Sequence, residues 1–266
     1  MPFRVAWLTD VHMDCAAPSF RDFLGRKVKA EAADVVVVTG DIATSSTIRN
    51  YLRQLRQDTG LPVYFVLGNH DLWGAKREVT YRIVRENTTP TLVWLQEAGV
   101  ISLTPRTALV GVDGWYDCRA GEFYESGFSM HDLKAVHDFK GLGKDSSLAL
   151  MQRMADQGTH KLLDRAEAAV KAGHTHVLLA THVPPFEDAC LYRGKKNDPR
   201  IMPFYCNRLM GEELLKLAAR HPRVNFTVLS GHTHGATTYS PLMNLECRVG
   251  GSTYLYPGVQ KTLEVD

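Results

Sequence analysis

The sequence predicts an α/β fold, and two observations lead to that expectation. In the first half of the chain, aliphatic and β-branched runs typical of buried strands alternate with segments of helical periodicity. Strands joined by helices of about 10–15 residues form βαβ units, so the sheet should be mostly parallel. Short polar clusters also follow the apolar runs, and the active sites of α/β sheets lie at the carboxyl ends of their strands.

The expected elements follow from these patterns along the chain. Strands are predicted at residues 3–9, 34–39, 63–67, 91–95, 100–103, 108–112 and 224–230, with one more that ends at His182. Helices are predicted at residues 20–33, 46–58, 72–86, 146–172 and 207–220. The tail alternates apolar and polar residues, so the second half should end in mixed or antiparallel sheet.

Two stretches without regular periodicity, at about residues 114–144 and 184–205, interrupt this pattern. Irregular segments of this length usually have a function, and a lid over an active site is the one expected here. The length of 266 residues and the hydrophobic share of 44% suffice to bury a substantial core without a disulfide. We therefore interpret residues 1–266 as a single domain with two lid segments.

The net charge of +2 is too small to indicate a nucleic-acid or membrane partner. No apolar run reaches the roughly 18 residues of a membrane span, and the first residues lead directly into the first strand without a signal peptide. The five cysteines are scattered and form no CxxC pair, so neither a disulfide framework nor a zinc ribbon is indicated. A cytoplasmic protein with reduced thiols is the expectation.

Five polar clusters at the ends of apolar runs carry histidine, aspartate and asparagine. They are Asp10-Val11-His12, Gly40-Asp41, Gly68-Asn69-His70-Asp71, Thr181-His182-Val183 and Gly231-His232-Thr233-His234. Any one of these histidines alone would more often be an ordinary core or surface residue. The whole set supplies oxygen and imidazole donors beyond strand ends, a combination that chance rarely produces. The sequence therefore predicts a metal site.

Seven of these side chains are candidate metal ligands: Asp10, His12, Asp41, Asn69, His182, His232 and His234. Ligands two residues apart at a strand end point to the same side if the backbone is extended. Asp41 could bridge two ions through its two oxygens. Seven ligands suit two divalent ions about 3.5–4 Å apart, and the donor set favours Mn, Fe, Zn or Co. Such a pair of ions activates a shared water for in-line displacement at phosphorus.

His70 and Asp71 are candidate catalytic residues. His70 is adjacent to Asn69, so in an extended segment its ring should point away from the ligands and toward a bound substrate. Asp71 could hold one ring nitrogen and favour the protonated form of His70. A protonated imidazole in that place would donate to the leaving-group oxygen as a general acid.

In order and approximate spacing, the five clusters resemble the signature of the calcineurin-like metallophosphoesterase superfamily over residues 10–234. The resemblance implies a four-layer α/β/β/α sandwich with two mixed central sheets. It implies that one metal is held by Asp10, His12, Asp41 and His234, and the other by Asp41, Asn69, His182 and His232. By the same resemblance, His70 would lie over the substrate with Asp71 behind it.

The second and third clusters depart from part of that superfamily. The protein Ser/Thr phosphatases continue the second motif as Gly-Asp-x-x-Asp-Arg-Gly, whereas this chain reads Gly40-Asp41-Ile42-Ala43-Thr44. Those phosphatases also have His-Glu where this chain has His70-Asp71. The pattern is closer to the branch that resembles class III cyclic-nucleotide phosphodiesterases and related bacterial phosphoesterases.

Substrate contacts are expected from the two irregular segments. Aromatic side chains such as Trp115 and Tyr116 could stack on a ligand, although packing within the lid is the competing interpretation. Basic side chains could hold phosphate oxygens, and the alternative for them is a solvated loop. These basic residues are Arg193, Lys195, Lys196 and Arg200.

The leading functional hypothesis is a dinuclear phosphoesterase, most simply one that cleaves a phosphodiester of a small or nucleotide-like molecule. A phosphomonoesterase or a nuclease of the same superfamily is the alternative. The near-neutral charge lacks the basic stripe that backbone binding to nucleic acid needs. A non-catalytic interaction module is the weakest hypothesis because every ligand position is filled.

Overall fold

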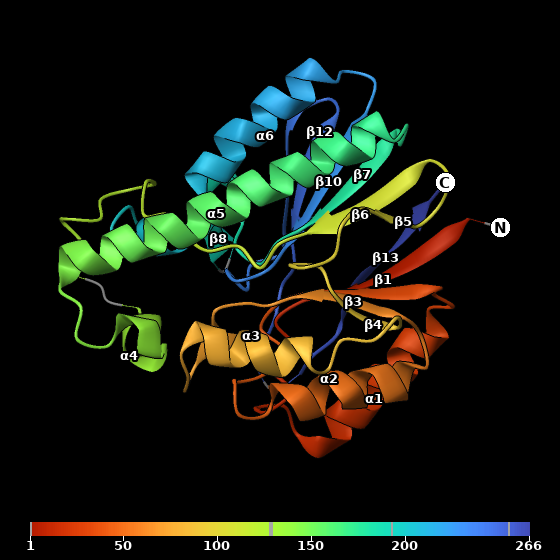
Figure 1. Cartoon of the computed structure of the whole chain (residues 1–266), viewed down its shortest axis with the longest axis horizontal. Helices are drawn as coiled ribbons and strands as arrows, with labels where there is room; N and C mark the ends of the chain where they lie inside the picture. Colours follow the sequence, from red (N-terminus) through yellow and green to blue (C-terminus); the bar gives the residue numbers. More distant parts are fainter. Residues whose placement is uncertain (1, 128–129, 193, 255) are drawn as a thin grey trace.

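The computed structural model describes residues 2–127, 130–192, 194–254 and 256–266. Two large sheets pack face to face and helices cover both outer faces, so the layers follow the order α/β/β/α (Figure 1). Each of these two sheets contains both parallel and antiparallel neighbours. The expected α/β fold with two mixed sheets is therefore confirmed.

The first sheet contains the amino-terminal strands. Its strand order is β13 (Val259–Val265), β1 (Phe3–Leu8), β2 (Val35–Thr39), β3 (Val63–Val66) and β4 (Leu92–Trp94). β1 to β4 are parallel, and β13 is antiparallel to β1. The helices on its outer face are α1 (Pro18–Ala30), α2 (Ile48–Thr59) and α3 (Arg77–Arg85) (Figure 1).

The second sheet has the strand order β11 (Thr237–Leu242), β12 (Leu245–Val249), β10 (Asn225–Ser230), β7 (His176–Ala180), β6 (Thr107–Gly111) and β5 (Ile101–Ser102). Its four central strands are parallel, and the two edge strands, β11 and β5, are antiparallel to their neighbours. The helices on its outer face are α5 (Lys144–Lys171) and α6 (Arg208–Arg220) (Figure 1).

Central strands such as β2 and β7 are largely apolar because both of their faces are covered. In β1, Val5 and Trp7 belong to the cluster between the two sheets, whereas Ala6 and Leu8 face the helices. The central strands of the second sheet divide in the same way: Leu178 of β7 lies between the sheets, and its neighbours pack against α5 and α6. Side chains alternate across a strand, so continuous aliphatic runs are what a doubly covered sheet requires.

The helix predicted at residues 72–86 begins later than expected, at Arg77. Instead of a continuous helix over residues 72–86, a 3-10 turn η1 (His70–Leu72) is followed by α3. Gly74 lies between them with φ of 86°, a left-handed conformation that a helix cannot contain. The result matters for the site because His70 lies in the short turn.

The two irregular segments contain only short elements. These are α4 (Asp132–Ala135), the 3-10 turns η2 (His137–Phe139), η3 (Glu187–Ala189) and η4 (Met202–Phe204), and the small hairpin of β8 (Leu191–Tyr192) and β9 (Lys195–Lys196). Within the described residues, no helix combines the length and the apolar character that crossing a bilayer requires.

Candidate metal centre

All seven predicted ligands lie in loops at one edge of the two sheets. The loops after β1, β2 and β3 carry Asp10 with His12, Asp41 and Asn69, and those after β7 and β10 carry the remaining histidines. The two sheets pack face to face, so the carboxyl ends of these five strands meet at the same edge. Ligands more than 200 positions apart are thereby brought together, as in the pair Asp10 and His234.

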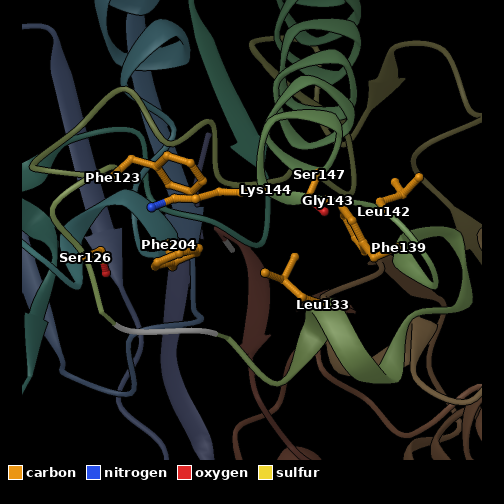
Figure 2. Close-up of a pocket in the computed structure, with 9 residues that line it drawn as sticks. All are labelled: Phe123, Ser126, Leu133, Phe139, Leu142, Gly143, Lys144, Ser147 and Phe204. Carbon is orange, nitrogen blue, oxygen red and sulfur yellow. The ribbon is translucent and has the colours of Figure 1, made fainter.

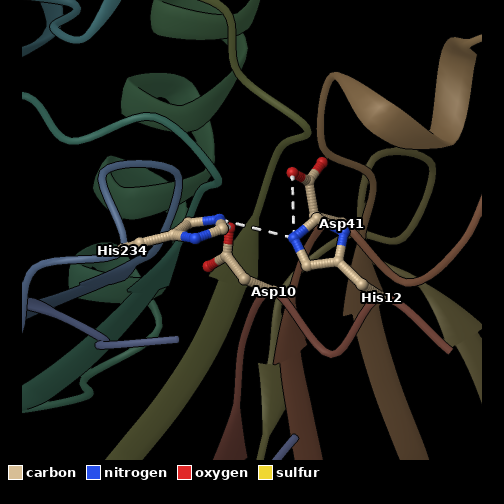
Figure 3. Close-up of side chains that lie close together, drawn as sticks. All are labelled: Asp10, His12, Asp41 and His234. Carbon is tan, nitrogen blue, oxygen red and sulfur yellow. Dashed lines mark hydrogen bonds and ion pairs between the residues drawn. The ribbon is translucent and has the colours of Figure 1, made fainter. Parts of the chain in front are cut away.

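Asp10, His12, Asp41 and His234 form the first group, and one donor atom of each lies within 4.8 Å of the donor atoms of the others (Figure 3). His234 Nε2 is 3.4 Å from Asp10 Oδ1 and also 3.4 Å from His12 Nε2. His12 Nε2 is 3.9 Å from Asp41 Oδ2. The donors point at a common volume, and this spacing suits ligands of one cation.

Asn69, His182 and His232 form a second group around the amide oxygen of Asn69. His182 Nε2 lies 3.0 Å and His232 Nδ1 2.9 Å from Asn69 Oδ1. His182 Nε2 is also 3.3 Å from Asp41 Oδ1. Asp41 therefore directs one oxygen toward each group, which is the arrangement that a bridging carboxylate needs.

Backbone carbonyls orient two of these histidines. Nδ1 of His182 lies 2.8 Å from the carbonyl oxygen of Thr39, and Nε2 of His232 lies 2.8 Å from that of Phe204. In the neutral ring, a nitrogen that donates to a carbonyl leaves the other nitrogen deprotonated and able to bind a metal. The two rings are thus held with Nε2 of His182 and Nδ1 of His232 toward the centre.

At five of the seven predicted ligands the backbone is left-handed, so the extended geometry expected for the pairs two residues apart was wrong. Asp10, His12, Asp41, His232 and His234 have φ between 38° and 71°. Among the described residues, they are five of the seven non-glycine positions with positive φ. This conformation costs about 1–2 kcal/mol per residue and concentrates at functional sites. The chain turns sharply as each strand ends, and the ligands converge through these turns.

The motif glycines leave room for carboxylates. A Cβ on Gly231 would lie 2.0 Å from Asp10 Oδ2, and a Cβ on Gly68 would lie 2.1 Å from Asp41 Oδ1. Contacts this short do not occur between real atoms. Each glycine therefore permits a ligand from a neighbouring loop to lie directly against the backbone.

Burial and nearby opposite charges determine the pKa values of the carboxylates and histidines of the centre. Burial alone would raise the pKa of Asp41, but the nearby His182 and His70 lower it well below its usual range. Burial tends to lower the pKa of His182, yet Asp41 and Asp10 raise it to about 10. For His232, burial dominates and lowers the pKa to about 4. Two buried carboxylates thus carry negative charge that attracts cations.

His70 lies at the side of the first group, where its ring stacks on Trp73 with centroids 3.5 Å apart. Its Nε2 is 3.8 Å from Asp41 Oδ2, and its backbone N–H donates to Asp41 Oδ1 at 2.9 Å. The expected extended backbone was wrong because the residue lies in η1. Burial is the largest influence on the pKa of His70 and lowers it, whereas Asp41 acts in the opposite direction.

Asp71 does not hold the His70 ring, so that expectation was wrong. Its carboxylate accepts hydrogen bonds from the backbone N–H groups of Ile42, Ala43 and Gly68, at 2.7–2.9 Å. Among the described residues, no hydrogen bond joins it to the ring of His70. The turn η1 directs the fully buried Asp71 side chain away from that ring and into the loop of Asp41. The Asp71 carboxylate therefore supports the backbone next to two predicted ligands, Asp41 and Asn69.

Asp132 is a buried residue of the centre that the sequence analysis missed. Its Oδ1 accepts hydrogen bonds from Asn69 Nδ2 at 2.8 Å and from Trp73 Nε1 at 2.6 Å, and its Oδ2 accepts one from Tyr116 at 3.1 Å. The residue lies in α4, within the irregular segment 114–144. No periodicity or spacing distinguishes it from the other aspartates of that segment.

The aromatic substrate contacts expected from the sequence are wrong. Trp115 and Tyr116 are buried in the hydrophobic core, with 2% and 0% of their surface exposed. Tyr116 stacks behind His232 with ring centroids 6.0 Å apart. The chain enters the core soon after β6, so both rings are packed inside the protein, and Tyr116 lies against a predicted ligand.

Two basic residues of segment 184–205 are paired with carboxylates of the same segment. Lys196 pairs with Asp188 at 2.9 Å, and Arg200 pairs with Asp198 at 2.8 Å. Lys195 is exposed in the β8–β9 hairpin. Arg193 lies outside the described residues. Lys196 and Arg200 each have a carboxylate partner in their own segment, and their expected contact with phosphate stays a prediction.

The fold and the donor set define a class of proteins with an α/β/β/α sandwich and a buried oxygen-and-imidazole centre at one edge of the sheets. The calcineurin-like phosphoesterase family model matches residues 3–236, and the chain belongs to this family. The resemblance in the five motifs is thus confirmed. Membership implies a hydrolase that acts on phosphoesters, in a family that typically uses two metal ions. No curated protein matches the chain.

The chain is also similar in fold to solved structures. Phosphopantetheinyl hydrolase from Mycobacterium tuberculosis is 14% identical, with 97% of this chain and 95% of that chain covered and a TM-score of 0.64. A dimetal phosphatase from Danio rerio is 15% identical, with 100% and 93% covered and a TM-score of 0.59. At such low identity the likeness shows the fold alone.

Proposed function

We propose that this protein hydrolyses phosphodiesters of small or nucleotide-like molecules with two divalent metal ions. The observation that carries the proposal is the position of Asp41, whose two oxygens face two separate groups of donors. A purely structural metal site would need one closed group of four ligands. A shared carboxylate between two groups instead suits a pair of ions.

The residues present fit two ions. Asp10, His12, Asp41 and His234 would hold one ion, and Asp41, Asn69, His182 and His232 would hold the other. Hard oxygen donors combined with imidazoles, without a thiolate, suit Mn, Fe or Zn. When bound, such ions supply an activated water and neutralise charge on phosphate oxygens.

His70 is the proposed general acid. Burial lowers its pKa in the protein alone, but a phosphoester near Nε2 adds negative charge that favours the imidazolium. The ring is held in place by its stack on Trp73, which in turn donates to Asp132. His70 would then pass its Nε2 proton to the departing ester oxygen.

We favour a diester over a monoester because, among the described residues, no Lys or Arg lines the cavity that contains His232 and His234. A monoester carries an additional negative charge that needs a further cation. The basic side chains Lys196 and Arg200 are paired with Asp188 and Asp198. A phosphomonoesterase is the alternative, and the substrate panel described below separates the two.

We also propose that residues 1–266 act as one domain in the cytoplasm, with segments 114–144 and 184–205 next to the substrate. All five cysteines are free, which suits a reducing compartment. The first segment supplies Asp132 to the centre, and the second supplies the carbonyl of Phe204.

The experiment is a hydrolysis panel with Mn-reconstituted protein, using an aryl monoester, an aryl diester, cyclic nucleotides and single-stranded DNA. We expect diester cleavage that a chelator abolishes and Mn restores. Activity that persists with full metal removal would disprove the dinuclear mechanism. A higher kcat/KM for the monoester would establish the alternative.

A further inference from the structure

A cavity of about 290 Å³ borders the metal centre. Two of the predicted ligands, His232 and His234, form one wall. The other walls include Tyr192, Asn197 and Tyr205 from segment 184–205, and Tyr254 from the connection between β12 and β13. A substrate whose phosphate lies at the centre would therefore extend one of its ester groups into this cavity.

Tyr254 lies directly over the centre. Its ring centroid is 4.5 Å from that of His12, 5.0 Å from that of His234 and 6.0 Å from that of His70. The side chain is 46% exposed, so it is not core packing. Tyr205 approaches from the other side, with its ring 5.2 Å from that of His232. Two aromatic rings of the cavity wall thus lie against predicted ligands.

The described residues of the cavity wall are uncharged apart from the histidines of the centre. Among the described lining residues there is no Lys, Arg, Asp or Glu. The amide of Asn197 is held by its donation to the carbonyl oxygen of Cys190 at 3.3 Å. A charged ester group would lose hydration here without gaining an ion pair. A flat ring could instead stack on tyrosine and bury apolar surface.

A second cavity, of about 260 Å³, does not compete for this role (Figure 2). Figure 2 shows Phe123 and Phe204 on one side and Phe139 on the other, with Lys144 reaching in from the start of α5. None of the predicted metal ligands lines it. Of the two cavities, the tyrosine-lined one has predicted ligands in its wall.

We propose that Tyr254 and Tyr205 form a subsite for an uncharged, planar ring carried by the substrate's ester group. The preferred substrates are then phosphoesters with an aromatic or heteroaromatic substituent, and those with aliphatic or anionic substituents are disfavoured. This inference rests on the proposed metal-dependent function, because the phosphate must be anchored at the centre.

The test uses calorimetric binding of three phosphonates to Mn-loaded protein: phenylphosphonate, cyclohexylphosphonate and methylphosphonate. Their carbon–phosphorus bond is not an ester, so binding is measured without turnover. We expect phenylphosphonate to bind at least about tenfold more tightly than methylphosphonate, with cyclohexylphosphonate between them. Tyr254→Leu should reduce the phenyl-to-methyl ratio to less than about threefold, and Tyr254→Phe should retain it.

Tyr256→Leu is the matched control. Tyr256 lies two positions further along the same connection, is 57% exposed and contacts Phe20 with ring centroids 4.6 Å apart. That variant should keep the full ratio. Equal affinity of the wild-type protein for the phenyl and methyl compounds, or a full ratio in Tyr254→Leu, would overturn the subsite. If diesters are still hydrolysed in that case, only the subsite is wrong; if no phosphonate binds and no ester is cleaved, the proposed function also fails.

Discussion

Asp132 accepts a hydrogen bond from the side-chain amide of Asn69, with 2.8 Å between Oδ1 and Nδ2. This bond turns Oδ1 of Asn69 toward His182 and His232. The same Asp132 oxygen accepts from Trp73, on which His70 stacks. One carboxylate of α4 thus orients both a predicted ligand and the ring beneath the proposed general acid.

Removing that carboxylate should weaken the centre without dismantling it. Asp132→Ala leaves the Asn69 amide free to rotate, so we expect Mn affinity to fall by about 10–100-fold. Asp132→Asn keeps one acceptor oxygen and should have a smaller effect. Calorimetric Mn titration measures both. Asp145→Asn, at an exposed position of α5, is the control. An equal loss of Mn affinity in this control would contradict the role of Asp132.

Asp41 should govern the number of bound ions. Asp41→Asn replaces the carboxylate that faces both groups of predicted ligands with a neutral, weaker metal ligand. We therefore expect the metal content to fall from two ions to at most one per chain. Elemental analysis after dialysis measures the ratio. The wild-type melting temperature should rise on Mn addition, because ligands that bind only the folded state stabilise it. An Asp41→Asn variant that retains two ions and the full Mn-dependent rise in melting temperature would show that Asp41 does not bridge two ions.

His70 should matter most for poor leaving groups. His70→Ala removes the proposed proton donor, and we expect kcat on an alkyl ester to fall by about 10²–10⁴-fold. An ester with an acidic phenol as leaving group needs less protonation and should lose less. Metal content is measured in parallel and should stay unchanged. Equal losses on both esters would assign His70 to substrate binding instead.

Gly231 should tolerate no side chain. In Gly231→Ala the new Cβ would lie 2.0 Å from Asp10 Oδ2, so the loop or the ligand must move. We expect a loss of about 1–3 kcal/mol in the free energy of unfolding together with weaker Mn binding. Chemical denaturation and metal titration test the two effects. Gly99→Ala, where the Cβ would meet nothing within 4 Å, should be nearly neutral.

Much of the centre could be predicted because its residues are local in sequence. Asp10 and His12, Asn69 and His70, and His232 and His234 each fall in one short cluster after an apolar run. Strand ends in an α/β sheet converge, so the ligand set followed from pattern and donor chemistry. The roles of His70 and Asp71 were harder to predict. They lie in the turn η1, where side chains point in other directions than in the extended segment that was expected.

Contacts between distant segments could not be predicted in the same way. Asp132 reaches Asn69 across 63 positions, and Tyr254 reaches His12 across 242. No spacing in the sequence connects these pairs. Trp115 and Tyr116 were assigned to the substrate because aromatic residues in an irregular segment look alike, whether they end up buried or exposed.

The sequence by itself determined the α/β fold, the seven candidate ligands and the family, since each depends on periodicity and on short motifs. Only the tertiary structure decided which carboxylate orients Asn69, which tyrosines lie against the predicted ligands and which basic residues are already paired. The physical reason is that side-chain direction in turns and loops depends on packing between elements, and left-handed backbone positions such as Asp10 and His232 have no signature in the pattern of apolar residues.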